Sequence, residues 1–204
     1  MGLLHDGASQ FRGWHRTLRE RHLRSYVFVH INKTGGSSIE KALGIGLDHS
    51  TALEKYHQLG PRAWQRKFTF TMVRNPWDKV VSHYHYRVRT NQTGLGERAI
   101  PFDQWLQRCY VDHDPRYYDQ PRMFMPQRQW LINEEGELLV EFIGRFENIE
   151  ADFRQICERL GTDAQLGHVK PSSRGSYRDY YDANSEALVR EFFAEDLELF
   201  GYQF

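Results

Sequence analysis

The sequence is poor in cysteine, has no net charge and contains no long apolar run. Its 204 residues include 2 cysteines, and 27 Lys and Arg balance 27 Asp and Glu. Cys109 and Cys157 lie far apart and outside any C-x-x-C pair, which favours two buried or idle thiols over a disulfide framework or metal site. Balanced charge gives no field that attracts nucleic acid or a membrane. No window approaches the ~20 apolar residues of a membrane helix, so we expect no membrane span.

The N-terminal segment and two glycosylation sequons bear on location and domain organisation. Residues 1–25 carry more basic than acidic side chains and too few apolar ones for a signal peptide. We expect there either a partly disordered arm or a short amphipathic helix, followed by one domain over residues 26–204. The sequons are Asn32-Lys33-Thr34 and Asn91-Gln92-Thr93. Because a glycan on Asn32 would block the loop described next, the cytoplasm is the expected location.

The stretch from Tyr26 to Leu43 has the pattern of a strand, a loop and a helix. An apolar run from Tyr26 to Ile31 fits a strand that is buried on both faces. The loop that follows carries a lysine, hydroxyls and two adjacent glycines, which permit a sharp turn and a close approach to a ligand. A helix that starts after such a loop points its free N–H groups at it. This combination predicts an anion site, for phosphate above all.

The order of residues in this loop differs from that of nucleoside triphosphatases. Their pattern is G-x-x-x-x-G-K-[ST], in which lysine follows the last glycine and a hydroxyl beside it binds Mg²⁺. Here Lys33 precedes both glycines, so its charge lies at the entrance of the loop.

A second strand and helix place an arginine beside this loop. The apolar run from Phe68 to Val73 leads directly into Arg74, Asn75 and Pro76. Asparagine is a good N-cap, and proline suits the first helical position. Arg74 therefore stands at the carboxyl end of a strand, where open α/β sheets bind ligands. Ser82 follows about two turns into the helix, away from its apolar face.

Other segments complete an alternation of strands and helices. We expect a third strand over Leu138–Arg145. A short helix capped by Asp48 or Ser50 should end at Leu59. Further helices are expected over Pro101–Tyr110, over Asn148–Leu160 and around Leu188–Leu197. Such alternation predicts an α/β fold with a parallel sheet.

Two of these segments resemble the carbohydrate sulfotransferase family, in both its Golgi and its bacterial branches. HINKTGGSSIEKAL is similar to the family's 5′-phosphosulfate loop, and FTFTMVRNPWDKVVSHYHY to its 3′-phosphate motif. FIGRFENIEADFRQICERLG and KPSSRGSYRDYY also resemble bacterial members. Asn32 stands where the family usually has proline. This difference removes no group that would bind the ligand. The resemblance implies a P-loop-like core with a central parallel sheet flanked by helices.

The resemblance also implies a donor, 3′-phosphoadenosine 5′-phosphosulfate (PAPS), which leaves as 3′,5′-bisphosphoadenosine (PAP) without a metal. By motif match the first loop holds the 5′-phosphosulfate, and an arginine and a serine hold the 3′-phosphate. Lys33 is also the catalytic cation that neutralises charge on the bridging oxygen. A late basic loop closes over the nucleotide, although a solvated charged loop is the alternative there. The implied donor-binding residues are Lys33, Thr34, Gly35, Gly36, Ser37, Ser38, Arg74, Ser82, Lys170 and Arg174.

An acceptor hydroxyl needs a general base, for which His49 is the first candidate. It follows the loop helix in a segment where relatives of this family place a catalytic histidine or glutamate. His57, Glu54 and Glu40 are the alternatives. A carbohydrate or carbohydrate-like acceptor is expected against the aromatic and basic stretch from Tyr84 to Trp130, although a protein interface has the same composition. The residues concerned are Tyr84, Tyr86, Arg87, Arg89, Tyr110, His113, Arg116, Tyr117, Tyr118 and Arg122.

Two functions compete with PAPS-dependent sulfotransfer. One is a P-loop kinase or NTPase, against which the order of lysine and glycine argues. The other is a non-catalytic module that binds a nucleotide or a sulfated glycan, against which the retained Lys33 argues.

Overall fold

The computed structural model describes residues 23–167 and 175–204, which form two compact units. The first unit holds the described residues up to Ile31, with Gly35–Met72 and Trp130–Gly167. The second holds Asn32–Thr34, Val73–Gln129 and the described residues after position 174. The single domain predicted for residues 26–204 stays a prediction.

The first unit is built on a three-stranded sheet with the order β1-β2-β3. Its strands are β1 (Tyr26–Val29), β2 (Phe68–Val73) and β3 (Phe142–Arg145). β1 and β2 run parallel, with Tyr26 opposite Phe68 and Val29 opposite Thr71. Both strands are buried along nearly their whole length, as their continuous apolar runs predict for a sheet covered on both faces. The predicted α/β class is therefore confirmed.

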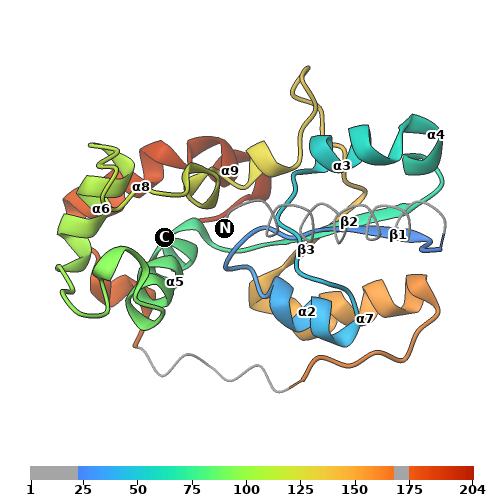
Figure 1. Ribbon diagram of the computed structural model, residues 1–204, viewed down its shortest axis with the longest axis horizontal. Coiled ribbons are helices and arrows are strands. Elements are labelled where there is room, and N and C mark those ends of the chain that lie inside the picture. The colour runs from blue at the N-terminus through green and yellow to red at the C-terminus, as the bar shows by residue number, and fades with distance from the viewer. Residues whose placement is uncertain (1–22, 168–174) are drawn as a thin grey trace, which may run out of the picture. The chain divides into compact units, whose positions relative to one another are not determined.

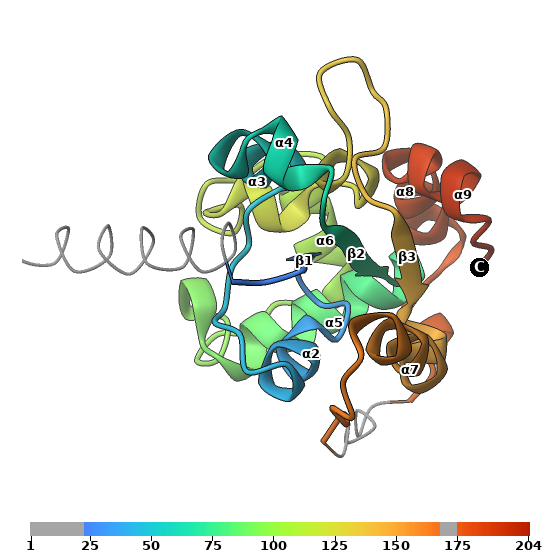
Figure 2. The ribbon, with the colours of Figure 1, turned by 90° about the vertical axis from the view of Figure 1, so that its right-hand side faces the viewer.

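Helices cover both faces of this sheet (Figures 1 and 2). α2 (Gly36–Ala42) and α7 (Ile149–Leu160) lie on one face, and α3 (Ala52–Leu59) and α4 (Pro61–Trp64) on the other. One core includes Phe28 and Phe70 from the sheet, Ile39 from α2 and Phe153 from α7. This packing fixes α2 against the sheet of the first unit.

The second unit is helical. Its helices are α5 (Pro76–Arg89), α6 (Phe102–Tyr110), α8 (Ala183–Phe192) and α9 (Ala194–Phe200). α5 begins as predicted, because the Asn75 side chain accepts a hydrogen bond from the backbone N–H of Trp77 and Pro76 occupies the first turn. The core of this unit joins Trp77 from α5, Trp105 from α6 and Val189 from α8. The short 3₁₀ helices of the two units are Gln92–Gly94, Pro121–Phe124, Arg128–Trp130, Phe146–Asn148 and Tyr177–Tyr180.

Candidate functional site

The loop after β1 turns at two residues with left-handed backbone conformations. Lys33 has a φ of 67° and Gly35 a φ of 87°. A left-handed lysine is uncommon, because its Cβ is crowded there. Gly35 is the N-cap of α2 without a side-chain hydrogen bond, and the first turn of α2 contains no acidic residue. The start of this helix therefore carries no negative side chain that would compete with an anion.

The two glycines of the loop are required by packing within the first unit. A Cβ on Gly36 would lie 2.0 Å from Cδ2 of His30, and one on Gly35 would lie 2.5 Å from Cδ1 of Ile149. The sequence predicts glycines that let a ligand approach the backbone. The structure adds a different reason for them, since protein side chains occupy the space that any Cβ would need.

The three hydroxyl residues of the loop differ in exposure. Thr34 is fully buried, whereas Ser38 is half-buried and Ser37 is exposed. The two serines of α2 are thus the hydroxyls that face solvent.

Within the second unit, Lys33 and Arg74 are joined to each other. Nη1 of Arg74 donates a hydrogen bond to the carbonyl oxygen of Lys33 at 3.1 Å. The ammonium group of Lys33 lies 4.1 Å from the centre of the Tyr86 ring on α5, a cation–π contact. The two motifs predicted to hold opposite ends of one nucleotide therefore meet at these residues. From the sequence, Tyr86 is predicted only to contact the acceptor, and no local pattern indicates that its ring contacts Lys33.

Arg74 is also held by Asp78, one helical turn further on. Nε of Arg74 donates to Oδ2 of Asp78 at 2.8 Å, and Nη2 lies 2.7 Å from the same oxygen. Ser82 follows Asp78 by four positions, so these two residues lie on one side of α5. Asp78 lies in the first turn of α5, and its carboxylate sets the orientation of the arginine.

His49 is oriented by the backbone at the end of β1. Its Nδ1 lies 3.0 Å from the carbonyl oxygen of His30. A carbonyl only accepts hydrogen bonds, so Nδ1 carries the proton and Nε2 of the neutral ring keeps its lone pair. Burial, above all, lowers the pKa of His49 below its usual 6.5, whereas the carboxylates of Glu40 and Asp48 act in the opposite direction. The half-buried ring is thus held as a neutral imidazole that can accept a proton.

The three alternative bases have other partners or positions in the first unit. Glu40 is buried, and its Oε1 lies 2.9 Å from Nδ1 of His30 and accepts from the backbone N–H of Asp48 at 3.2 Å. Glu54 forms a capping box with Thr51 at the start of α3. Thr51, rather than the predicted Asp48 or Ser50, is therefore the N-cap. His57 lies exposed in the last turn of α3. Of the four candidates, His49 has the geometry best suited to a base.

Several residues predicted to contact an acceptor instead maintain the second unit. Arg87 is 0% exposed, and its guanidinium donates to the carbonyl of Tyr117 and to Asp119. Tyr110 is buried in the core. Arg87 and Tyr110 therefore do not form an acceptor surface. The exposed members of the predicted set are Arg89, His113, Arg116 and Arg122.

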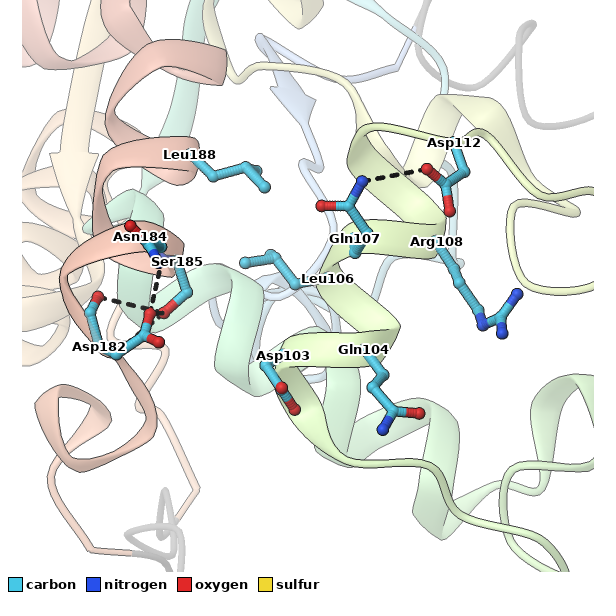
Figure 3. Close-up of a pocket in the computed structure, with 10 residues that line it drawn as sticks. All are labelled: Asp103, Gln104, Leu106, Gln107, Arg108, Asp112, Asp182, Asn184, Ser185 and Leu188. Carbon is cyan, nitrogen blue, oxygen red and sulfur yellow. Dashed lines mark hydrogen bonds between the residues drawn. The ribbon is translucent and has the colours of Figure 1, made fainter.

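A cavity of about 470 Å³ lies between α6 and α8 in the second unit (Figure 3). Two pairs of its polar lining residues bond to each other: Gln107 donates to Asp112, and Asp182 pairs with Ser185 at the start of α8. None of the predicted site residues lines this cavity.

Two of the predicted segments lie outside the residues that the structure describes. Lys170 and Arg174 lie in the segment 168–174, and most of the predicted N-terminal arm lies in residues 1–22, neither of which the structure describes. Within residues 23–167 and 175–204, no helix is long and apolar enough to cross a membrane. The same residues contain no group of three or more His, Cys, Asp or Glu placed to hold a metal ion. Cys109 and Cys157 are buried free thiols, as predicted.

Fold and site together define an α/β protein whose first two strands each lead into a charged loop and then a helix. The sequence profile of the sulfotransferase family matches residues 15–203. The chain therefore belongs to the sulfotransferase family, which supports sulfuryl transfer as its general activity. An uncharacterized protein of Archaeoglobus fulgidus is 26% identical to it over 124 residues, which span 60% of this chain and 92% of that protein. No solved structure matches the chain.

Proposed function

We propose that this protein transfers a sulfuryl group from PAPS to a hydroxyl of a carbohydrate or carbohydrate-like acceptor. The observation that carries the proposal is the 3.1 Å hydrogen bond from Arg74 to the carbonyl of Lys33. It joins the residue assigned to the 3′-phosphate with the residue assigned to the 5′-phosphosulfate, 41 positions apart in the sequence. Two cationic residues tied together in this way suit a donor that carries an anionic group at each end of its nucleoside.

Lys33 supplies the positive charge for the proposed reaction. The acceptor oxygen attacks sulfur in line while the bond between sulfur and the bridging phosphate oxygen breaks. Negative charge grows on that bridging oxygen, and the ammonium group of Lys33 neutralises it. The contact with the Tyr86 ring at 4.1 Å supports this role, because it gives the flexible lysine side chain a defined position.

His49 takes the proton of the acceptor hydroxyl in this proposal. Its Nδ1 donates to the carbonyl of His30, so the proton from the acceptor passes to Nε2. Its lowered pKa keeps the ring neutral, and therefore competent as a base, at neutral pH.

The proposed acceptor class depends on basic and aromatic side chains in the last turn of α5 and in the segment after it. Arg89, Arg122 and His113 are exposed, and the ring of the half-buried Tyr86 lies near the cations of both Lys33 and Arg89. Guanidinium groups recognise acidic substituents, and aromatic rings stack on sugar faces. These side chains fit a polyhydroxyl or anionic acceptor.

Ligand-dependent melting of the full chain tests the donor. PAP in the presence of a chelator should raise the melting temperature, since a ligand at ~100 times its dissociation constant adds about 2.7 kcal/mol of stability. Arg74→Ala should reduce this shift strongly, whereas the control Arg62→Ala, an exposed arginine of α4, should keep it. Transfer itself is then measured with labelled PAPS and a panel of acceptors, by the mass gained.

The same measurements separate the two competing functions. A shift of equal size with ATP that requires Mg²⁺ would favour the kinase or NTPase. Binding of PAP with no transfer to any acceptor, including sulfated and unsulfated glycans, would favour the non-catalytic module.

A further inference from the structure

The backbone of Arg74 is held by a buried glutamine from a distant part of the second unit. The backbone N–H of Arg74 donates to Oε1 of Gln127 at 2.9 Å, and Nε2 of Gln127 donates to the carbonyl oxygen of Arg74 at 2.8 Å. Arg74 comes directly after β2, so the glutamine side chain serves both backbone groups just where the strand ends. A side-chain amide can do this because it donates and accepts in one plane.

Asp196 in the first turn of α9 holds Gln127 in turn. Its Oδ2 accepts from the backbone N–H of Gln127 at 2.7 Å and from Nε2 of the same residue at 3.3 Å. Its Oδ1 accepts from the backbone N–H of Arg128 at 2.8 Å. Since a carboxylate only accepts, the amide nitrogen of Gln127 must face Asp196. That orientation is the one that also serves both backbone groups of Arg74.

Every group in this chain of hydrogen bonds is shielded from water. Gln127 and Asp196 are both 0% exposed, and Arg74 is 7% exposed. A buried hydrogen bond that loses one partner leaves the other unsatisfied, which costs more than the bond itself contributes. The position of Arg74 therefore depends on both residues.

We propose that Gln127 and Asp196 are positioning residues of the nucleotide site, which fix the backbone of Arg74 so that its guanidinium meets the 3′-phosphate. This inference rests on the proposed function, in which Arg74 binds that phosphate. Neither residue touches the ligand in this proposal. Gln127 acts through the backbone of Arg74, and Asp196 acts through Gln127.

Calorimetric titration with two nucleotides tests the proposal on the full chain. PAP carries the 3′-phosphate, and adenosine 5′-phosphate lacks it. Gln127→Met keeps the length of the side chain but loses both hydrogen bonds to Arg74, so the dissociation constant for PAP should rise about tenfold or more. Affinity for adenosine 5′-phosphate should change little. Gln129→Met, an exposed glutamine two positions on, is the matched control and should leave both affinities unchanged.

A second variant and a second measurement keep the test decisive if Gln127→Met folds poorly. Asp196→Asn should weaken PAP binding in the same selective way, and in both variants the amide hydrogen of Arg74 should exchange faster than in the wild type. Unchanged PAP affinity in the variants, or an equal loss for both nucleotides, would overturn the proposal. If the wild type binds no PAP, the proposed function fails instead. If the amide hydrogen of Arg74 exchanges at the same rate in the variants and the wild type, then Gln127 does not fix the backbone of Arg74, whatever the nucleotide affinities are.

Discussion

At the scale of single residues, Arg74, His49 and Lys33 are each oriented by a neighbour that does not take part in the proposed transfer. Asp78 holds the guanidinium of Arg74, and the His30 carbonyl holds the ring of His49. The Tyr86 ring lies against the ammonium of Lys33. Groups fixed before the substrate arrives need less reorganisation during reaction, which is a main source of catalytic power. These partners should therefore affect turnover even though none of them reacts.

His49→Ala should reduce turnover by roughly 10²–10⁴-fold, the usual contribution of a general base. PAP affinity should stay nearly constant, because His49 is assigned to neither phosphate. In the wild type the neutral ring is active, so activity should fall as pH drops through the pKa of His49. Burial lowers that pKa, which places the acidic limb of the rate profile below 6.5. The limb should disappear in His49→Ala, as pH–rate profiles of both proteins would reveal.

His57→Ala is the matched control, since this exposed histidine lies on α3 of the same unit. It should retain both the rate and the acidic limb. If His57→Ala abolished turnover while His49→Ala left it nearly unchanged, the base would be His57. Glu40→Gln and Glu54→Gln test the other two candidates in the same way.

Residue roles that depend on a local motif could be predicted from the sequence, whereas those that depend on distant pairing could not. Lys33 and Arg74 each lie in a recognisable strand–loop–helix pattern. Gln127 is 53 positions from Arg74 and 69 from Asp196, and such pairs leave no periodic or local signal in one sequence. Arg87 is the converse case. Its surroundings are polar in sequence, but the side chain is buried and its guanidinium donates to Asp119 and to the carbonyl of Tyr117.

At the scale of elements, the ends of helices and strands were predicted correctly where the sequence has a strong local pattern, and incorrectly where the pattern is weak. β2 and the start of α5 match the prediction, because an apolar run ends at an asparagine cap followed by proline. β3 is shorter than predicted and begins at Phe142, while Leu138 makes only an isolated antiparallel bridge to Ile132. The single C-terminal helix face divides into α8 and α9 at Phe193. Apolar periodicity continues across that break, so periodicity alone could not reveal it.

Gly36→Ala should destabilise the start of α2, although alanine is the better helix former. Its Cβ would lie 2.0 Å from the ring of His30, which is itself buried and bonded to Glu40. Overpacking of this kind costs typically about 1–3 kcal/mol. Urea unfolding should measure this loss.

Gly46→Ala is the control for that substitution, since a Cβ on Gly46 would meet nothing within 4 Å. It should leave stability nearly unchanged. The double variant Gly36→Ala/His30→Ala should recover part of the loss relative to His30→Ala alone, because the colliding ring is gone. If Gly36→Ala matched Gly46→Ala in stability, packing against His30 could not be the reason for this glycine.

At the scale of the whole molecule, each unit has its own apolar core, and the second unit also buries the side chains of Lys79 and Asp196. Lys79 is 1% exposed and Asp196 0%. Burial lowers the pKa of Lys79 from 10.5 to about 8, while the charge of Asp196 acts against this change. Burial likewise raises the pKa of Asp196. Asp196 therefore has two effects: its charge acts on the pKa of Lys79, and its oxygens hold Gln127, which in turn bonds to Arg74.

The buried lysine should make stability increase with pH in the alkaline range. The pKa of Lys79 is about 8 in the folded state and 10.5 as its ordinary value. Between these values the unfolded chain binds the proton that the folded protein has released, so the free energy of unfolding rises with pH. At about 1.4 kcal/mol for each pH unit, the whole gain is about 3 kcal/mol. Below pH 8 both states are protonated, and the cost of burying the ammonium is fully present.

Comparison with Lys79→Met isolates this gain from the other groups that titrate at alkaline pH. Urea unfolding of both proteins at intervals from pH 7.5 to 10.5 should show the wild type gaining about 3 kcal/mol relative to the variant. Lys41→Met removes an exposed lysine at the end of α2 and should follow the wild type at every pH. Parallel curves for the wild type and Lys79→Met would mean that Lys79 stays charged in the folded protein. In that case the attraction of the Asp196 charge outweighs the effect of burial on the pKa of Lys79.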